Sequence, residues 1–239
     1  MVAVVTTDKE VKVSRWTAER WAAASGMAFA IVLVAGGFST GTPPHYDASA
    51  SKIGAYLRDH HKALTVQSAL SGLLIVLFLW FLSSFAGAFR EAGQRRLSTI
   101  MYGAGVVTLT LAAVGDALSI ATVRLNLIDG AGAASAFYAV TMFFYVKLFW
   151  GAATLALATA LAAKRSGFLP QWYAGLSLLG AVDFVLTGLS MRQHGFFSPS
   201  GAMTFIGFIG FAVWIFVSSV LLVRKTAGAP ATSADTEHA

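Results

Sequence analysis

The chain has 239 residues, of which 56% are hydrophobic and only 12% charged, and it contains no cysteine. Soluble domains are about 25% charged, so this chain cannot cover a water-facing surface and its apolar residues are expected to face lipid. The composition argues against a water-soluble enzyme, a disordered chain, and a disulfide framework or cysteine-ligated metal centre. The net charge of +6 lies in short basic clusters between apolar runs, without the basic stripe interleaved with aromatics that nucleic-acid binding requires.

A charged N-terminal segment, residues 1–20, precedes six apolar stretches, each of the length that spans a hydrocarbon core. Backbone groups in lipid must be paired within a helix or a closed barrel, and uniformly apolar runs of this length favour helices. The first stretch lacks a clear signal-peptide cleavage pattern, so we expect it to be retained. The sequence therefore predicts an all-α, polytopic membrane protein, with a six-transmembrane-helix bundle within residues 21–225. The predicted spans are 21–38, 64–89, 99–123, 137–163, 172–191 and 202–223.

The one sizeable loop, residues 39–62, follows the first span. Pro43 and Pro44 cannot continue a helix, whereas Asp47 is a good N-cap, and apolar residues then recur at helical spacing over 48–60. These apolar residues are Ile53, Tyr56 and Leu57. They predict a short amphipathic helix on the outer surface, which either caps the bundle or forms a lid over a substrate path.

Basic residues are distributed unequally between the two sides of the predicted bundle. Eleven Lys and Arg residues lie on the side that holds both chain termini and five lie on the other, with Lys147 inside a helix. Cytoplasmic loops carry the excess of basic residues. Both termini are therefore predicted to be cytoplasmic, in a multi-pass protein of the inner (cell) membrane. The tail of residues 226–239 has no apolar periodicity and is predicted to be disordered.

Three parts of the sequence together form a pattern that is also found in other membrane proteins. The loop after the first span reads DASASKIGAYLRDH from Asp47 to His60, the second span follows directly, and the turn before the fifth span reads GFLPQW from Gly167 to Trp172. This arrangement resembles a family of uncharacterised six-helix bacterial integral membrane proteins, with a D-A-S-A, I-x-A-Y, D-H loop after the first helix and G-x-L-P-x-W in a later hairpin. The resemblance covers most of the chain. It implies the six-helix architecture and no particular activity.

Three charged residues lie inside the predicted spans, where each costs several kcal/mol unless it is paired or hydrated. Counted from the predicted outer helix ends, Asp116, Lys147 and Asp183 all lie roughly 12 to 15 Å below the outer surface. The shared depth predicts a buried Asp/Lys/Asp cluster, whose surplus negative charge favours a bound cation or a proton. Two interpretations stay open, a cation or proton site in a transport path and an ion-pair clasp that fixes helix packing. Which carboxylate pairs with Lys147 is open as well.

Four hydroxyl residues lie outward of this predicted cluster, at positions where they could line a wet path to the outside. Such hydroxyls also commonly bond to their own helix backbone. They are Ser119, Thr122, Thr187 and Ser190.

No histidine lies within a predicted span, so bis-histidine haem ligation is not expected and the chain is predicted to need no cofactor. His60, His61 and His194, with Asp59, could meet at the outer face, but adjacent histidines point to different faces of a helix. No metal site is therefore expected, and His60 and His194 are the candidates that remain. The nucleophile, zinc-protease and phosphate-loop motifs are all missing from the sequence, so no catalytic residue and no enzyme activity is predicted.

A ladder of small residues, Ala152, Ala156 and Ala160, allows close helix approach. It packs either within the bundle or against a second copy or a partner membrane protein. Our first hypothesis is small-solute or ion transport, or a channel, centred on the charged cluster. The alternative is a non-catalytic membrane subunit or scaffold that docks a partner protein. Besides the lipid bilayer, the sequence identifies neither substrate nor partner, and no nucleic acid is expected.

Overall fold

The computed structural model describes the backbone of residues 8–228 and the side chains of residues 18–226, and this part of the chain is entirely helical. Each of the six predicted spans coincides with one helix, except that the span 172–191 runs three residues beyond the end of its helix at Gly188. A further short helix forms in the loop after the first span. The helices are α1 (Asp8–Ser39), α2 (Ala50–Asp59), α3 (His61–Glu91), α4 (Arg95–Ile128), α5 (Ala131–Ser166), α6 (Gln171–Gly188) and α7 (Ala202–Gly228). Of the tail predicted to be disordered, residues 226–228 end α7 and residues 229–239 lie outside the described part.

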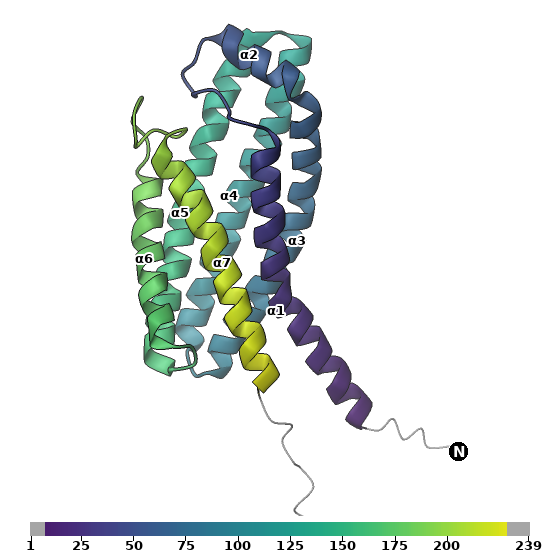
Figure 1. Ribbon diagram of the computed structural model, residues 1–239, viewed down its shortest axis with the longest axis vertical. Helices are drawn as coiled ribbons and strands as arrows, with labels where there is room; N and C mark the ends of the chain where they lie inside the picture. The colour runs from purple at the N-terminus through teal and green to yellow at the C-terminus, as the bar shows by residue number, and fades with distance from the viewer. Residues whose placement is uncertain (1–7, 229–239) are drawn as a thin grey trace, which may run out of the picture.

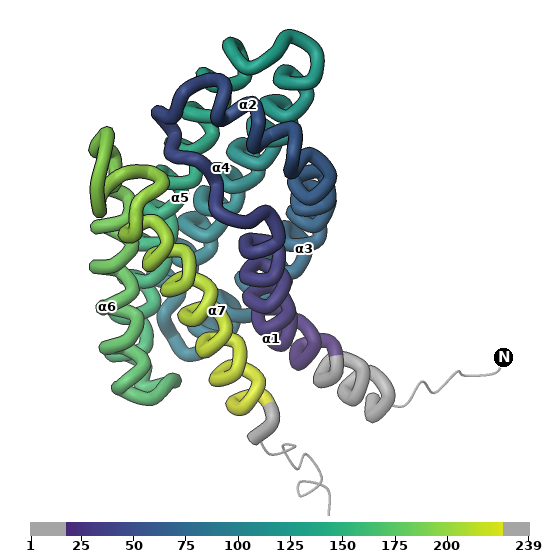
Figure 2. The backbone as a smooth tube through the Cα atoms, turned by 45° about the horizontal axis from the view of Figure 1, so that its top comes forward, coloured from purple at the N-terminus to yellow at the C-terminus, as the bar shows by residue number. Residues whose placement is uncertain are grey.

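The six long helices form a closed ring in chain order. Each packs against the next, from α1 to α3, α4, α5, α6 and α7, and α7 packs back on α1. Figure 1 shows the helices running alternately up and down, with the α3–α4 and α5–α6 turns at the same end as the C-terminal end of α7. Figure 2 shows α2 lying across the opposite end. The ring thus has one end formed by short turns and one end covered by a helix and longer loops.

The outer surface of the ring is apolar. Among the described residues, five helices are long and apolar enough to cross a membrane, namely α1 from Ala18, α3, α4, α5 and α7 to Thr226. The helix α6 is not among them, because its 18 residues include polar ones such as Gln171 and Asp183, which lower its mean hydropathy. Large apolar side chains are exposed on every one of the six long helices. Examples are Ile31, Val76, Trp80, Val107, Leu157, Leu179, Val182 and Val213.

Polar groups lie inside the ring and join neighbouring helices. The Ser25 hydroxyl lies 2.9 Å from the Leu77 carbonyl of α3 and 2.7 Å from the Ala22 carbonyl of its own helix, so it can donate to either. The Trp214 indole N–H donates to Ser177 Oγ at 3.0 Å, linking α7 to α6. Hydrogen bonds between helices are the expected polar contacts where the outer surface faces an apolar medium, since no water competes for them.

Small residues bring α5 close to its neighbours. A Cβ atom on Gly151 would lie 2.4 Å from Thr108 Oγ1 and 3.0 Å from the Ala104 carbonyl oxygen, so α4 and α5 touch through backbone at this point. The predicted alanine ladder on the same helix is buried inside the chain. Its residues are Ala152, Ala156 and Ala160. This face therefore packs within the bundle.

The short helix α2 forms within the range in which the sequence predicts an amphipathic helix. Ser49 caps it by accepting a hydrogen bond from the Lys52 N–H, so Asp47 is not the N-cap. Asp47 contacts two histidines instead, as described below. Ile53 and Leu57 are buried against side chains near the ends of α4 and α5. The Asn126 side-chain amide donates to the Gly54 carbonyl at 3.0 Å. These contacts fix α2 to the α4–α5 hairpin.

Candidate functional site

A cavity of about 640 Å³ lies inside the ring, toward the end that α2 covers. Its walls come from α1, α3, α4, α5 and α7, and its roof from α2 and the loop before it. Two hydrogen bonds hold this roof, from the Tyr56 hydroxyl to the Thr40 carbonyl at 3.2 Å and from the Tyr138 hydroxyl to the Pro44 carbonyl at 2.9 Å. The lining is mostly apolar and aromatic, and its volume lies in the range of about 300–1,000 Å³ typical of small-molecule sites.

Aromatic side chains close the cavity toward the opposite end of the ring. Phe29, Phe78 and Phe211 line it and pack on one another, with ring centroids 5.1 to 6.3 Å apart. Beyond them, Phe81, Phe85 and Trp214 are fully buried and fill the interior. The cavity therefore does not continue as an open path through the bundle.

Asp116 on α4 is the one charged residue among the described residues that line the cavity. Its Oδ2 atom accepts a hydrogen bond of 2.8 Å from the Ser68 hydroxyl on α3. The Ser71 hydroxyl, one turn further along α3, lies 2.7 Å from the same oxygen and 2.7 Å from the Ser68 carbonyl, so it can donate to either. Within the described residues Oδ1 accepts no hydrogen bond. One carboxylate oxygen is thus anchored to α3, and the other is available to a ligand.

Two further polar groups lie beside this carboxylate. Tyr145 on α5 lies near Asp116, and its hydroxyl is within hydrogen-bonding reach of Ser119. Both Tyr145 and Ser119 line the cavity. Together with the serines of α3, they gather polar groups around the carboxylate, whereas α1 and α7 supply mainly apolar residues and phenylalanines, with Thr204 as the polar lining residue of α7. An amphipathic molecule would meet a negative charge at one end and an apolar surface at the other.

The predicted cluster of Asp116, Lys147 and Asp183 does not form. Within the described side chains no ion pair joins Lys147 to either carboxylate, and Lys147 is exposed on the outside of the ring. Asp183 lies against α7 instead, where a Cβ atom on Gly210 would be 2.6 Å from its Oδ2 atom. Asp116 is the member of the predicted cluster that lines the cavity.

Helix geometry explains why the prediction was wrong. Tyr145 and Lys147 are two positions apart on α5, about 200° around the helix, so a helix that turns Tyr145 toward Asp116 turns Lys147 outward. The equal depths predicted for the three charged residues also depended on the predicted ends of their helices, and the helices in the structure end at other residues. Measured from the helix ends at the turn end of the ring, Asp116 lies about 32 Å along α4, Lys147 about 28 Å along α5 and Asp183 about 18 Å along α6.

Of the four hydroxyls predicted to line a path outward, Ser119 lies on the cavity. The other three bond to backbone carbonyls of α4 or α6, the alternative that the sequence left open, with Ser190 doing so from just beyond the end of α6. Thr122 donates to Leu118 at 2.7 Å, Thr187 to Asp183 at 2.9 Å and Ser190 to Leu186 at 3.3 Å. All three are buried in helix packing and do not line the cavity.

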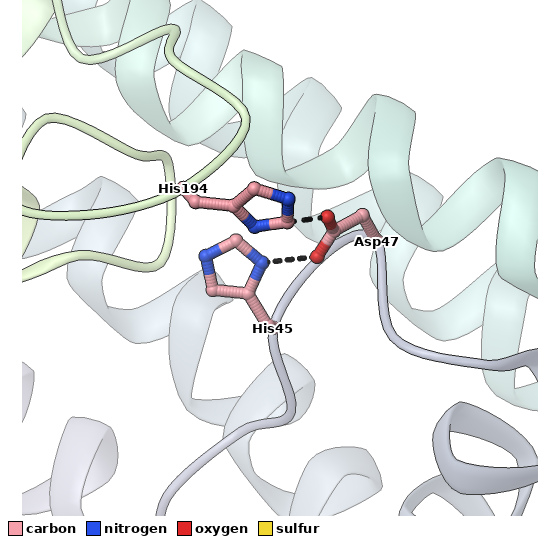
Figure 3. Close-up of side chains that lie close together, drawn as sticks. All are labelled: His45, Asp47 and His194. Atoms are coloured by element: carbon pink, nitrogen blue, oxygen red, sulfur yellow. Dashed lines mark hydrogen bonds and ion pairs between the residues drawn. The ribbon is translucent and has the colours of Figure 1, made fainter.

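A second group of polar side chains lies where the α1–α2 loop meets the α6–α7 loop (Figure 3). Asp47 Oδ1 contacts His45 Nδ1, and Asp47 Oδ2 lies 3.2 Å from His194 Nδ1. The hydrogen bond from His45 lowers the pKa of the Asp47 carboxyl below its usual range. One ligating atom from each of these residues lies within 4.8 Å of the other two, close enough to share a metal ion. His60, the other predicted candidate, stacks on Tyr56 in α2 and is not part of this group.

Several residues of both sites were missed by the sequence-based reasoning. Ser68 and Ser71 could have been identified from the sequence. Two serines three positions apart on an apolar helix lie on one face, and this pattern predicts a polar group on the neighbouring helix. His45 and Asp47 could have been identified as well, because the side chains of a His-x-Asp pair in a proline-rich loop can come together in a turn. Here the His45 carbonyl accepts the Ala48 N–H at 3.0 Å and closes that turn.

Comparisons of this chain with protein-family models, with curated proteins and with solved structures found no match.

Proposed function

We propose that this protein crosses the membrane six times, with both termini in the cytoplasm, and that it binds a small organic cation with an apolar body in the cavity beside Asp116. The observation that carries this proposal is the chemistry of the cavity wall, where a single carboxylate with one unbonded oxygen faces apolar and aromatic side chains. Transport of that molecule is the role that this site suits best.

The position of α6 in the ring supports a sixth span. At 18 residues it is about 27 Å long, close to the roughly 30 Å of a hydrocarbon core. It packs between α5 and α7, both apolar enough to span. Its outward residues are apolar as well. They are Leu178, Leu179, Val182 and Leu186. An element between two spanning helices, with an apolar outer face, belongs in the same slab of lipid.

The lengths of α4 and α5 support an outer cap. With 34 and 36 residues they are about 51 and 54 Å long, some 20 Å more than a hydrocarbon core. The helix α2 packs against the end of this excess length. With the turn end of the ring at the opposite surface, α2 and the ends of α4 and α5 stand outside the membrane. Lys147 then lies near the outer headgroups, where its ammonium group can reach water.

The basic residues support this orientation. Basic residues lie at the helix ends that flank the α3–α4 and α5–α6 turns and near the end of α7. They are Arg90, Arg95, Lys164, Arg165, Arg224 and Lys225. Since excess Lys and Arg mark the cytoplasmic side, the turn end faces the cytoplasm. The cavity then lies in the outer half of the bundle.

The chemical class of the ligand follows from the residues that line the cavity. A cation gains from the Asp116 carboxylate, because an opposite charge in a water-poor site is attracted more strongly than in bulk water. Aromatic rings around the cavity offer their faces to a cationic group or to apolar arms. Moving such a molecule across the membrane requires the phenylalanines below the cavity to separate. The alternative role is a subunit that docks a partner protein, and the burial of the alanine face within the bundle gives it less support.

Equilibrium binding of tetraphenylphosphonium to the protein in nanodiscs tests the proposal. Tetraphenylborate is the matched control, because it has nearly the same size and shape and the opposite charge. After subtraction of binding to empty nanodiscs, we expect the cation to bind at least about tenfold more tightly than the anion, a difference of about 1.4 kcal/mol. Asp116→Asn should abolish this preference.

Asp183→Asn is the control variant, because Asp183 is a carboxylate in the middle part of a long helix and does not line the cavity. It should leave the preference unchanged. Equal binding of the two ions to the parent protein would overturn the proposal, and so would an unchanged preference in Asp116→Asn. Uptake of the cation by proteoliposomes, lost in Asp116→Asn, would separate a carrier from a protein that only binds.

A further inference from the structure

The three side chains His45, Asp47 and His194 come from two loops that are far apart in sequence. A hydrogen bond of 3.1 Å joins His45 Nε2 to Ser198 Oγ, 153 residues further along the chain. The Tyr46 N–H donates to Ser200 Oγ at 3.3 Å. These contacts hold the α1–α2 loop against the α6–α7 loop and bring His45 and Asp47 beside His194.

The three side chains lie at the surface to different degrees. The His194 side chain is 74% exposed, and those of His45 and Asp47 are 32% and 30% exposed. Exposed pairs between histidine and a carboxylate stabilise a fold very little. The ring of His45 packs on Tyr46 and on His194, with ring centroids 5.2 and 5.6 Å apart, so part of the convergence is ring packing. The carboxylate of Asp47 nevertheless lies between two imidazole nitrogens, which is the arrangement of a ligand set.

The spacing of the ligating atoms suits a metal ion. The two histidine Nδ1 atoms face the two oxygens of one carboxylate, as Figure 3 shows. In a tetrahedral zinc site with bonds of about 2.0 to 2.1 Å, neighbouring ligand atoms are about 3.4 Å apart. The distance of 3.2 Å between His194 Nδ1 and Asp47 Oδ2 is close to that value. With all three ligating atoms within 4.8 Å of one another, small side-chain rotations complete the set.

We propose that His45, Asp47 and His194 form a binding site for a divalent transition-metal ion of the zinc class. Two imidazole nitrogens and one carboxylate oxygen suit such an ion better than Ca²⁺ or Mg²⁺, which prefer oxygen ligands. Three protein ligands leave the fourth position to water. Ser198 Oγ supports the site, because a histidine that binds a metal through one ring nitrogen usually engages the other in a hydrogen bond. This proposal is independent of the function proposed for the cavity.

The ion joins the two loops, so it should also stabilise the folded protein. Anything that binds the folded chain alone raises its stability in proportion to the logarithm of its concentration over the dissociation constant. The thermal unfolding midpoint should therefore rise with added Zn²⁺. This second readout does not depend on any activity.

Titration of the full-length protein tests the site. The protein is purified in nanodiscs with a tag that contains no histidine and is stripped with a chelator. Zn²⁺ is then titrated by calorimetry, and Co²⁺ by its visible absorption. We expect one ion per chain, and Co²⁺ bands of a four- or five-coordinate site. Each of the variants His45→Ala, Asp47→Asn and His194→Ala should weaken Zn²⁺ binding by about tenfold or more.

His61→Ala is the matched control, because His61 is a partly exposed histidine outside this group, and its Nδ1 atom pairs with the Arg58 carbonyl at 2.7 Å. It should bind Zn²⁺ like the parent. If His45→Ala misfolds, His194→Ala carries the test, since that side chain is exposed. The proposal is overturned if the parent shows no saturable binding, which would leave a hydrogen-bonded group without a metal. Equal affinity in the parent and in His194→Ala would overturn it too, as would a loss in His61→Ala as large as in His194→Ala.

Discussion

Removing the Asp116 carboxylate tests how the cavity wall is held together. In Asp116→Ala the Ser68 hydroxyl loses the acceptor that it reaches at 2.8 Å across the α3–α4 contact. Ser71 behaves differently, because its hydroxyl already lies 2.7 Å from the Ser68 carbonyl and keeps that acceptor. The loss of free energy of unfolding is therefore set mainly by one interhelical hydrogen bond.

The size of that loss can be bounded. Interhelical side-chain hydrogen bonds in membrane proteins average about 0.6 kcal/mol and reach about 1.7 kcal/mol. A charged acceptor places the Asp116–Ser68 bond in the upper part of this range. We therefore expect a coupling free energy of about 1 to 1.7 kcal/mol between Asp116→Ala and Ser68→Ala. Lys147→Ala should change the free energy of unfolding by no more than about 0.5 kcal/mol, as for other exposed positions.

Double-mutant cycles in mixed micelles measure these couplings through reversible unfolding. Asp116→Ala combined with Lys147→Ala should be additive within about 0.5 kcal/mol, because the two side chains form no ion pair. A coupling above about 1 kcal/mol between Asp116 and Lys147 would refute the placement of Lys147 outside the ring. Additive behaviour of Asp116 and Ser68 would refute the α3–α4 link.

Three further predictions concern packing and topology. Gly151→Ala should lower the free energy of unfolding by about 1 to 3 kcal/mol, because its Cβ atom meets backbone of α4; Gly103→Ala, with open space around its Cβ, should lose none of it. Gly54→Ala should speed amide hydrogen exchange across α2, because its Cβ atom would lie 2.6 Å from a side chain at the start of α5; unchanged exchange would contradict the docking of α2. In whole cells an impermeant thiol reagent should label Thr42→Cys and spare Ser166→Cys, and the reverse pattern would exclude the proposed orientation.

Much of the fold was predictable because it depends on patterns along single helices. Apolar length alone located every long helix, and the spacing of Ile53 and Leu57 predicted both α2 and the face that it buries. The N-cap of α2 was not predictable in the same way. Asp47 and Ser49 are both good capping residues, and the choice depends on His45 and His194, of which His194 reaches this loop only in the folded chain.

The candidate site was harder to predict because it depends on how helices rotate against one another. Asp116 was identified from the cost of a charge inside an apolar segment, and it does line the cavity. Its supposed partner was identified by depth alone, and depth says nothing about which way a side chain faces. Lys147 shares the level of Asp116 to within about 4 Å yet lies on the opposite face of α5 from Tyr145. The cavity itself arises from gaps between five helices, which no local pattern records.

Protection of a single cysteine in the cavity tests the central claim most directly. The chain has no cysteine, and Gly36 is a buried residue of the cavity wall with open space around a Cβ atom. We expect N-ethylmaleimide to label Gly36→Cys in nanodiscs, and tetraphenylphosphonium to slow that labelling by about tenfold at saturation, whereas the exposed control Ser51→Cys on α2 should react at the same rate with or without the cation. Equal rates for Gly36→Cys with and without the cation would show that the ligand does not occupy the cavity, and would contradict the account.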